Sequence, residues 1–115
     1  MKVQPYEIRL YQAHDGHEPF ADWLASFRDL RARARIEQRI NRLMKGNFGD
    51  CKPLKNASGV HELRLDFGPG YRVYFSMEET VIVLLLTGGD KSSQDKDIRK
   101  AINYWNEYTR RRSEV

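Results

Sequence analysis

The sequence has only one cysteine, Cys51, and no long hydrophobic run. A single thiol forms no disulfide within the chain, and nothing in the composition indicates an oxidising compartment. The longest apolar run, residues 81–86, is far too short for a membrane-spanning helix. The first residues also lack the apolar segment of a signal peptide. We therefore expect a cytoplasmic protein that does not associate with membranes.

Motifs for metals and nucleotides are absent as well. The chain contains no HExxH, CxxC, P-loop or GxGxxG sequence, and its three histidines lack carboxylate or cysteine partners at metal-binding spacing. The sequence therefore predicts no metal site and no cofactor. No repeat or linker divides the 115 residues, so we expect one domain over 1–115 in which 110–115 form a frayed basic tail.

Positive charge is present in excess and is unevenly distributed. The chain has 20 Lys and Arg against 16 Asp and Glu, a formal net charge of +4. Between Arg28 and Lys45, seven basic residues stand against two acidic ones, and the tail carries Arg110-Arg111-Arg112. This concentration favours an anionic partner.

Hydrophobic periodicity predicts a layered domain. Alternation indicates a strand over 6–11, and apolar residues at helical spacing indicate a helix from Pro19, a second helix over 30–45 and a last helix around Ile98–Trp105. We interpret 48–58 as irregular and expect three antiparallel strands at 60–67, 71–77 and 81–86. Helices before a meander of strands predict an α+β fold, with two N-terminal helices and a C-terminal helix packed on a small, mainly antiparallel four-stranded sheet.

The meander also carries the candidate site. Alternation places Arg64, Arg72 and Tyr74 on one face of the sheet, with Lys91 at a strand end and His61 on the opposite, apolar face. The turn Gly68-Pro69-Gly70 joins the two arginine strands. Such a face can hold a phosphate, because the planar arginine fork donates two parallel hydrogen bonds.

Structural roles compete with this interpretation. Arg64 has Glu62 and Asp66 on its own face as ion-pair partners, and Lys91 beside Asp90 can be an ordinary charge at a helix entry. Tyr74 can be a partly buried sheet residue. The stripe of Arg31, Arg35, Gln38 and Arg42 on the second helix is either a solvated face or a binding surface.

Three segments together resemble a known family. They are His61-Glu62-Leu63-Arg64, Gly68-Pro69-Gly70-Tyr71-Arg72-Val73-Tyr74 and Leu86-Thr87-Gly88-Gly89-Asp90-Lys91. This combination resembles the RelE/ParE superfamily of bacterial toxins, and within it the HigB-like, phage-derived addiction module killer branch. The resemblance covers roughly residues 5–105 and implies a RelE-like fold.

The resemblance also implies a function. It suggests the toxin of a type II toxin–antitoxin module, which cuts mRNA on the ribosome as a metal-independent endoribonuclease. In this reading Arg72, Lys91 and Arg64 serve catalysis, whereas Lys55, Tyr74 and Lys52 bind RNA. Several ribonuclease members carry a tyrosine or histidine shortly after the last motif, but here that region reads Ser92-Ser93-Gln94-Asp95-Lys96-Asp97, so no general acid or base is assigned.

The implied partners are a co-encoded antitoxin, often a helix-turn-helix protein, and mRNA on the ribosome. Contact with operator DNA is expected only through the antitoxin. Two other functions remain open at this point. One is inhibition of DNA gyrase, as in the ParE branch, and the other is an inactive relic that only binds its antitoxin and regulates the operon. The arginine stripe of the second helix would then contact either the ribosome or the antitoxin.

Overall fold

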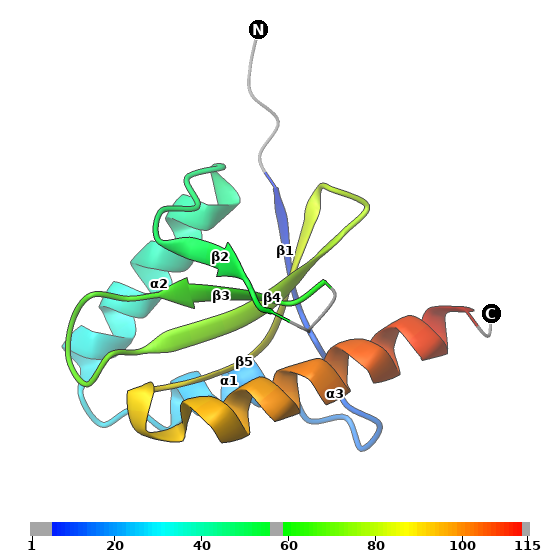
Figure 1. The fold of residues 1–115 in the computed structure, drawn as a ribbon. Coiled ribbons are helices and arrows are strands. Elements are labelled where there is room, and N and C mark those ends of the chain that lie inside the picture. Colours follow the sequence, from blue (N-terminus) through cyan, green and yellow to red (C-terminus); the bar gives the residue numbers. More distant parts are fainter. Residues whose placement is uncertain (1–5, 56–58, 114–115) are drawn as a thin grey trace, which may run out of the picture.

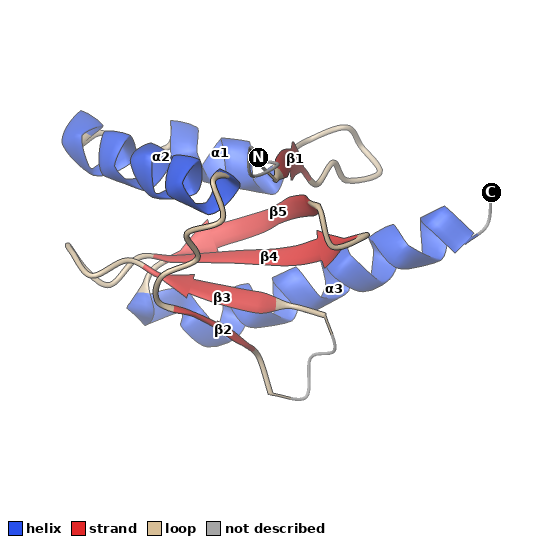
Figure 2. Cartoon of the chain, turned by 90° about the horizontal axis from the view of Figure 1, so that it is seen from above, coloured by secondary structure: helices blue, strands red, loops and turns tan. Residues whose placement is uncertain are grey.

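A five-stranded sheet with helices on both faces forms the protein (Figures 1 and 2). The structure is a computed structural model that describes residues 6–55 and 59–113. The elements in order are β1 (Glu7–Leu10), α1 (Pro19–Ala25), α2 (Leu30–Met44), β2 (Cys51–Pro53), β3 (His61–Arg64), β4 (Arg72–Glu78), β5 (Ile82–Gly89), the short 3-10 helix η1 (Lys91–Ser93) and α3 (Gln94–Ser113). The predicted α+β class is confirmed. Within the described ranges, no helix combines the length and apolar character that crossing a membrane requires.

The sheet has the strand order β1-β5-β4-β3-β2. β1 runs parallel to β5, and all other neighbours are antiparallel. The expected number of four strands is therefore wrong, because β2 lies in the segment interpreted as irregular. Proline has no N–H for a central strand, but Pro53 is tolerated here because β2 is an edge strand.

Two separate apolar layers hold the helices to the sheet. Figure 2 shows α1 and α2 on one face and α3 on the other. On the first face, Ile36 and Leu43 of α2 pack with Phe75 of β4, whereas on the second face Ala101 of α3 packs with Leu84 of β5. Every residue of β5 is buried, as its unbroken apolar run predicted.

A β-bulge changes the direction of side chains near the end of β5. Tyr74 pairs with Thr87 and Phe75 pairs with Leu85, so Leu86 is an extra residue in β5. A bulge of this kind locally reverses the alternation of faces. A Cβ atom on Gly88 would lie 2.3 Å from the Trp23 ring of α1, and one on Gly89 would lie 1.8 Å from the Asp97 carboxylate of α3. The glycine pair thus allows both helices to approach the end of β5.

The helix ends follow from local chemistry, with one departure. Asp29 caps α2 by accepting from the N–H groups of Arg31 and Ala32, and Gly46 follows the helix with a positive φ of 92°. The tail expected to fray continues instead as helix up to Ser113. Glu78 of β4 holds it, through an ion pair with Arg112 (3.2 Å) and a hydrogen bond from Tyr108. Residues 114–115 and 56–58 lie outside the described residues.

Candidate functional site

Two rows of side chains cross the sheet on the face that carries α3. In one row, Arg64 of β3 is paired directly with Arg72 of β4, which in turn pairs with Gly89. In the adjacent row, Glu62 lies between Lys52 of β2 and Tyr74 of β4. The Gly68–Gly70 turn sets this register. The sequence prediction that Arg64, Arg72 and Tyr74 share a face is confirmed.

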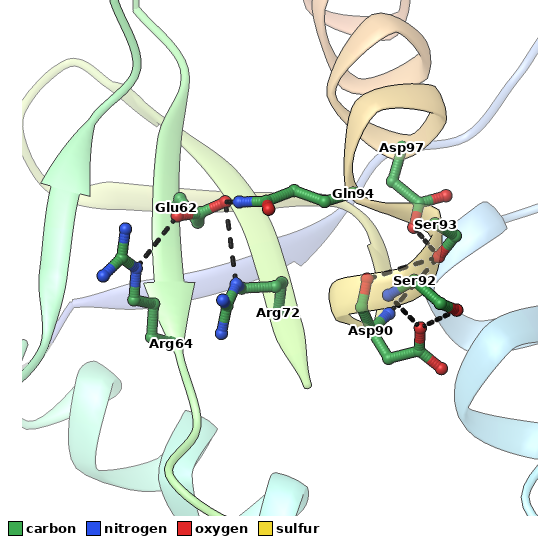
Figure 3. Close-up of polar contacts among 8 residues, drawn as sticks. All are labelled: Glu62, Arg64, Arg72, Asp90, Ser92, Ser93, Gln94 and Asp97. Atoms are coloured by element: carbon green, nitrogen blue, oxygen red, sulfur yellow. Dashed lines mark hydrogen bonds and ion pairs between the residues drawn. The ribbon is translucent and has the colours of Figure 1, made fainter. Parts of the chain in front are cut away.

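Two arginines directly opposite each other would repel, and the carboxylate of Glu62 separates their charges (Figure 3). Glu62 accepts a hydrogen bond from Arg64 Nε at 3.2 Å and from Gln94 Nε2 at 2.8 Å, and Arg72 Nε lies 3.9 Å from it. Both arginines therefore face Glu62 with Nε. Within the described part of the chain, their terminal amino groups donate to no other side chain or backbone group.

The carboxylate itself is inaccessible, since Glu62 is 1% exposed. Burial alone would raise its pKa, but hydrogen bonds from Gln94 and Arg64 and the charge of Arg72 outweigh burial and hold the pKa of Glu62 below its usual value. Glu62 is thus ionised at neutral pH. We call Glu62, Arg64 and Arg72 the arginine cluster.

Lys91 lies at the border of the arginine cluster. Its backbone N–H donates to the carbonyl of Pro69 (3.4 Å), in the turn that precedes Arg72. Asp90 fixes the entry to η1 by accepting from the N–H and hydroxyl groups of Ser92. Lys91 is exposed and has no ion-pair partner among residues 6–55 and 59–113. The structure therefore brings a third cation to the same end of the sheet.

Lys52 and Lys55 lie on the other side of Glu62. Both are exposed, and they line a hollow of about 290 Å³ together with Glu62 and Gln94. Lys52 is held in this position by its pairing with Glu62 across β2 and β3. The predicted RNA-binding lysines thus border the arginine cluster without belonging to it.

Tyr74 does not meet the expectation of RNA binding. Its side chain is completely buried under α3, so no surface remains for stacking on a base, and the structural alternative is confirmed. Burial, followed by the charge of Glu62, raises the pKa of Tyr74. His61 lies on the opposite face, as expected, where its ring stacks on Phe75 with centroids 5.2 Å apart.

Sequence reasoning missed the central position of Glu62 and the role of Gln94. Alternation did put Glu62 on the face of Arg64, and this was the available signal. It could not show that Glu62 also reaches Arg72, nor that α3 carries an amide to it. Both contacts depend on strand register and helix packing.

Among the described residues, no group of three or more His, Cys, Asp or Glu side chains is arranged to hold a metal ion.

No protein-family model matches the chain. The chain is similar to an uncharacterized protein of Haemophilus influenzae, with 54% identity over 82 residues. The match covers 71% of this chain and 81% of the Haemophilus protein.

Proposed function

We propose that this chain is the toxin of a bacterial type II toxin–antitoxin module and cleaves mRNA on the ribosome. The chain belongs to the same family as the uncharacterized Haemophilus influenzae protein. The arginine cluster is the observation that carries this proposal. Glu62 holds Arg64 through a hydrogen bond from Nε and faces Nε of Arg72 at 3.9 Å, and the outer donors of both guanidinium groups bond no other described group. The α+β architecture is compatible with the RelE-like fold that the sequence motifs suggest.

The proposed reaction uses the 2′-hydroxyl of the RNA. Its oxygen attacks the adjacent phosphorus, the bond to the 5′-oxygen of the next nucleotide breaks, and a cyclic phosphate and a free 5′-hydroxyl result. The proton lost by the 2′-hydroxyl is balanced by the proton that the leaving 5′-oxygen takes up. Arg64 and Arg72 stabilise the charge that develops on the phosphate oxygens, and Lys91 adds a third positive charge.

Glu62 positions the arginines in this mechanism. It is 1% exposed and already accepts hydrogen bonds from two side chains, so it is poorly placed to receive the proton of the substrate. Its charge instead holds Arg64 and Arg72 side by side. Fixed donors avoid the reorganisation that flexible surface arginines would require.

We also propose that a co-encoded antitoxin neutralises the protein in the cytoplasm by covering this face. An acidic segment of the antitoxin would pair with Arg64, Arg72 and Lys91 and so compete with the phosphate. Folding of a disordered segment on its target is a common way to cover such a surface.

The proposal is tested by mapping mRNA 5′ ends in a translating extract. Wild-type protein is expected to create new ends at codons in the ribosomal A site, and Arg72→Ala to reduce them by about a hundredfold or more. Arg110→Ala is the matched control, since Arg110 is exposed near the end of α3. Intact message, together with growth arrest in cells that express the protein, would point to inhibition of DNA gyrase. Intact message without growth arrest would indicate an inactive relic.

A further inference from the structure

We propose that α2 and the β3–β4 turn form a second binding groove, which holds the sugar–phosphate backbone of a single-stranded RNA beside the bond to be cut. This inference builds on the proposed function. It concerns a surface that adjoins the arginine cluster and shares Arg64 with it, and it names the substrate strand as the occupant of the α2 arginine stripe. We call this surface the α2 groove and define it by Arg35, Arg39, Arg42 and Arg64.

Two adjoining hollows make the α2 groove continuous with the arginine cluster. One, of about 320 Å³, extends from the α2 arginines to Arg64, and the other, of about 460 Å³, extends from Arg64 past the turn to Arg72. Asp50, Arg64 and Phe67 line both hollows. An RNA strand bound at Arg64 and Arg72 can therefore continue along α2 while staying within these hollows.

The charge of the groove suits an anion. Its walls carry four arginines against two aspartates, Asp50 and Asp66. Across 6–55 and 59–113, no ion pair shorter than 4 Å joins these arginines to these aspartates. The aspartates thus leave an excess of positive charge that a phosphate backbone can neutralise.

Helix stability does not account for the arginine stripe. α2 contains five arginines and one glutamate, Glu37, which is spaced four residues from Arg33 on another side of the helix. Arg31, Arg35 and Arg39 follow one another at intervals of four, so like charges are neighbours on the helix surface. Such neighbours destabilise a helix. If this face only met solvent, carboxylates at some of these positions would make the helix more stable. A surface that binds an anion uses the arginines instead.

Two of the arginines are also held in place. The guanidinium of Arg35 lies 4.0 Å from the centroid of the Phe67 ring. Arg39 donates to the backbone carbonyls of Asn47 (3.0 Å) and Phe48. Arg42 has no hydrogen-bonded or ion-pair partner among the described residues. The groove therefore combines fixed and free cations, as in a site that follows a flexible polyanion.

A single RNA strand fits this arrangement better than an acidic peptide. The groove leads directly into the cluster proposed to cut RNA, so the same strand reaches both. In-line attack by a 2′-hydroxyl also requires a strand that is free of duplex geometry, and unpaired RNA is the form that proteins most often recognise.

The test measures binding of a short single-stranded RNA whose 2′-O-methyl groups prevent cleavage. Fluorescence anisotropy at several salt concentrations gives the slope of log K against log[salt] for the wild type and for Arg35→Gln/Arg42→Gln. Each lost phosphate contact lowers this slope by about 0.7 for a single strand, so the double variant should lose about 1.4. Lys100→Gln/Arg110→Gln is the matched control, since it removes two exposed charges of α3.

A reduced slope in the α2 variant alone, with thermal unfolding unchanged, supports the groove. Equal slopes in the two double variants overturn it. A polyglutamate peptide is tested in the same way as a model of an acidic peptide, and an α2 variant that loses binding of this peptide but keeps binding of RNA also overturns the groove. A wild-type protein that cuts message in the extract yet does not bind free RNA overturns the groove and leaves the proposed function intact. RNA binding that depends on the α2 arginines, in a protein that cuts no message in the extract, would support the groove and refute the proposed cleavage of mRNA.

Discussion

Replacing Glu62 by glutamine should destabilise the protein because it removes the buried negative charge that faces both Arg64 and Arg72. Glutamine keeps the size of the side chain and can still accept from Gln94. Arg64 is 37% exposed, so its lost ion pair costs less than about 1 kcal/mol. Arg72 is only 13% exposed and loses its counter-charge in a mostly buried position, which costs roughly 2 kcal/mol. We expect a total of about 2–3 kcal/mol.

Thermal unfolding followed by circular dichroism measures this effect. At about 4 °C for each kcal/mol in a domain of this size, the midpoint should fall by about 10 °C. Glu37→Gln on the exposed side of α2 is the matched control and should change stability by no more than about 0.5 kcal/mol. A Glu62→Gln midpoint equal to that of the control would refute the role of Glu62 as the charge that holds the arginines.

The same variant has a pH signature. The pKa of Glu62 is lower in the folded than in the unfolded protein, so the unfolded state binds the proton first as pH falls. The stabilisation by the carboxylate is therefore complete above the ordinary pKa of 4.5 and is lost as pH falls through the lower folded value. The stability difference between wild type and Glu62→Gln should be constant near neutrality and shrink only below about pH 4.5. A difference that does not change with acidification contradicts this account.

Two further substitutions test the packing around the site. Gly89→Ala would place a Cβ atom 1.8 Å from the Asp97 carboxylate, so we expect the free energy of unfolding to fall by about 1–3 kcal/mol or more. Chemical denaturation measures this loss, and an unchanged midpoint would show that α3 can shift away from β5 at little cost. Tyr74→Phe removes a buried hydroxyl that has no hydrogen-bond partner in the described structure, so stability should change by less than about 1 kcal/mol and mRNA cleavage should persist. A tenfold loss of cleavage in Tyr74→Phe would mean that this hydroxyl reaches the RNA.

Local patterns predicted most of the elements. The helical spacing of Phe20, Trp23 and Leu24 identified α1, and alternation around Arg64 and Arg72 identified the shared face of β3 and β4. These patterns suffice because each depends on neighbours in the chain and on one buried side.

The remaining features depend on contacts between distant segments. β2 has three residues and includes Pro53, so nothing local distinguishes it from a loop until β3 pairs with it. The bulge at Leu86 lies in a uniformly apolar run, where alternation carries no information. The central place of Glu62 requires Arg72 from the next strand and Gln94 from α3. A sequence pattern on one strand cannot supply these partners.

The strand order also determines when the sheet can be completed during synthesis of the chain. β1 is made early but pairs only with β5, and the strand that carries Arg72 also pairs with β5, through Gly89. A nascent chain that ends before β5 has an unpaired first strand. Pairing between such distant segments is slow compared with local helix formation. Each molecule thus assembles the end of the sheet that carries Arg64 and Arg72 only after most of its chain has been made.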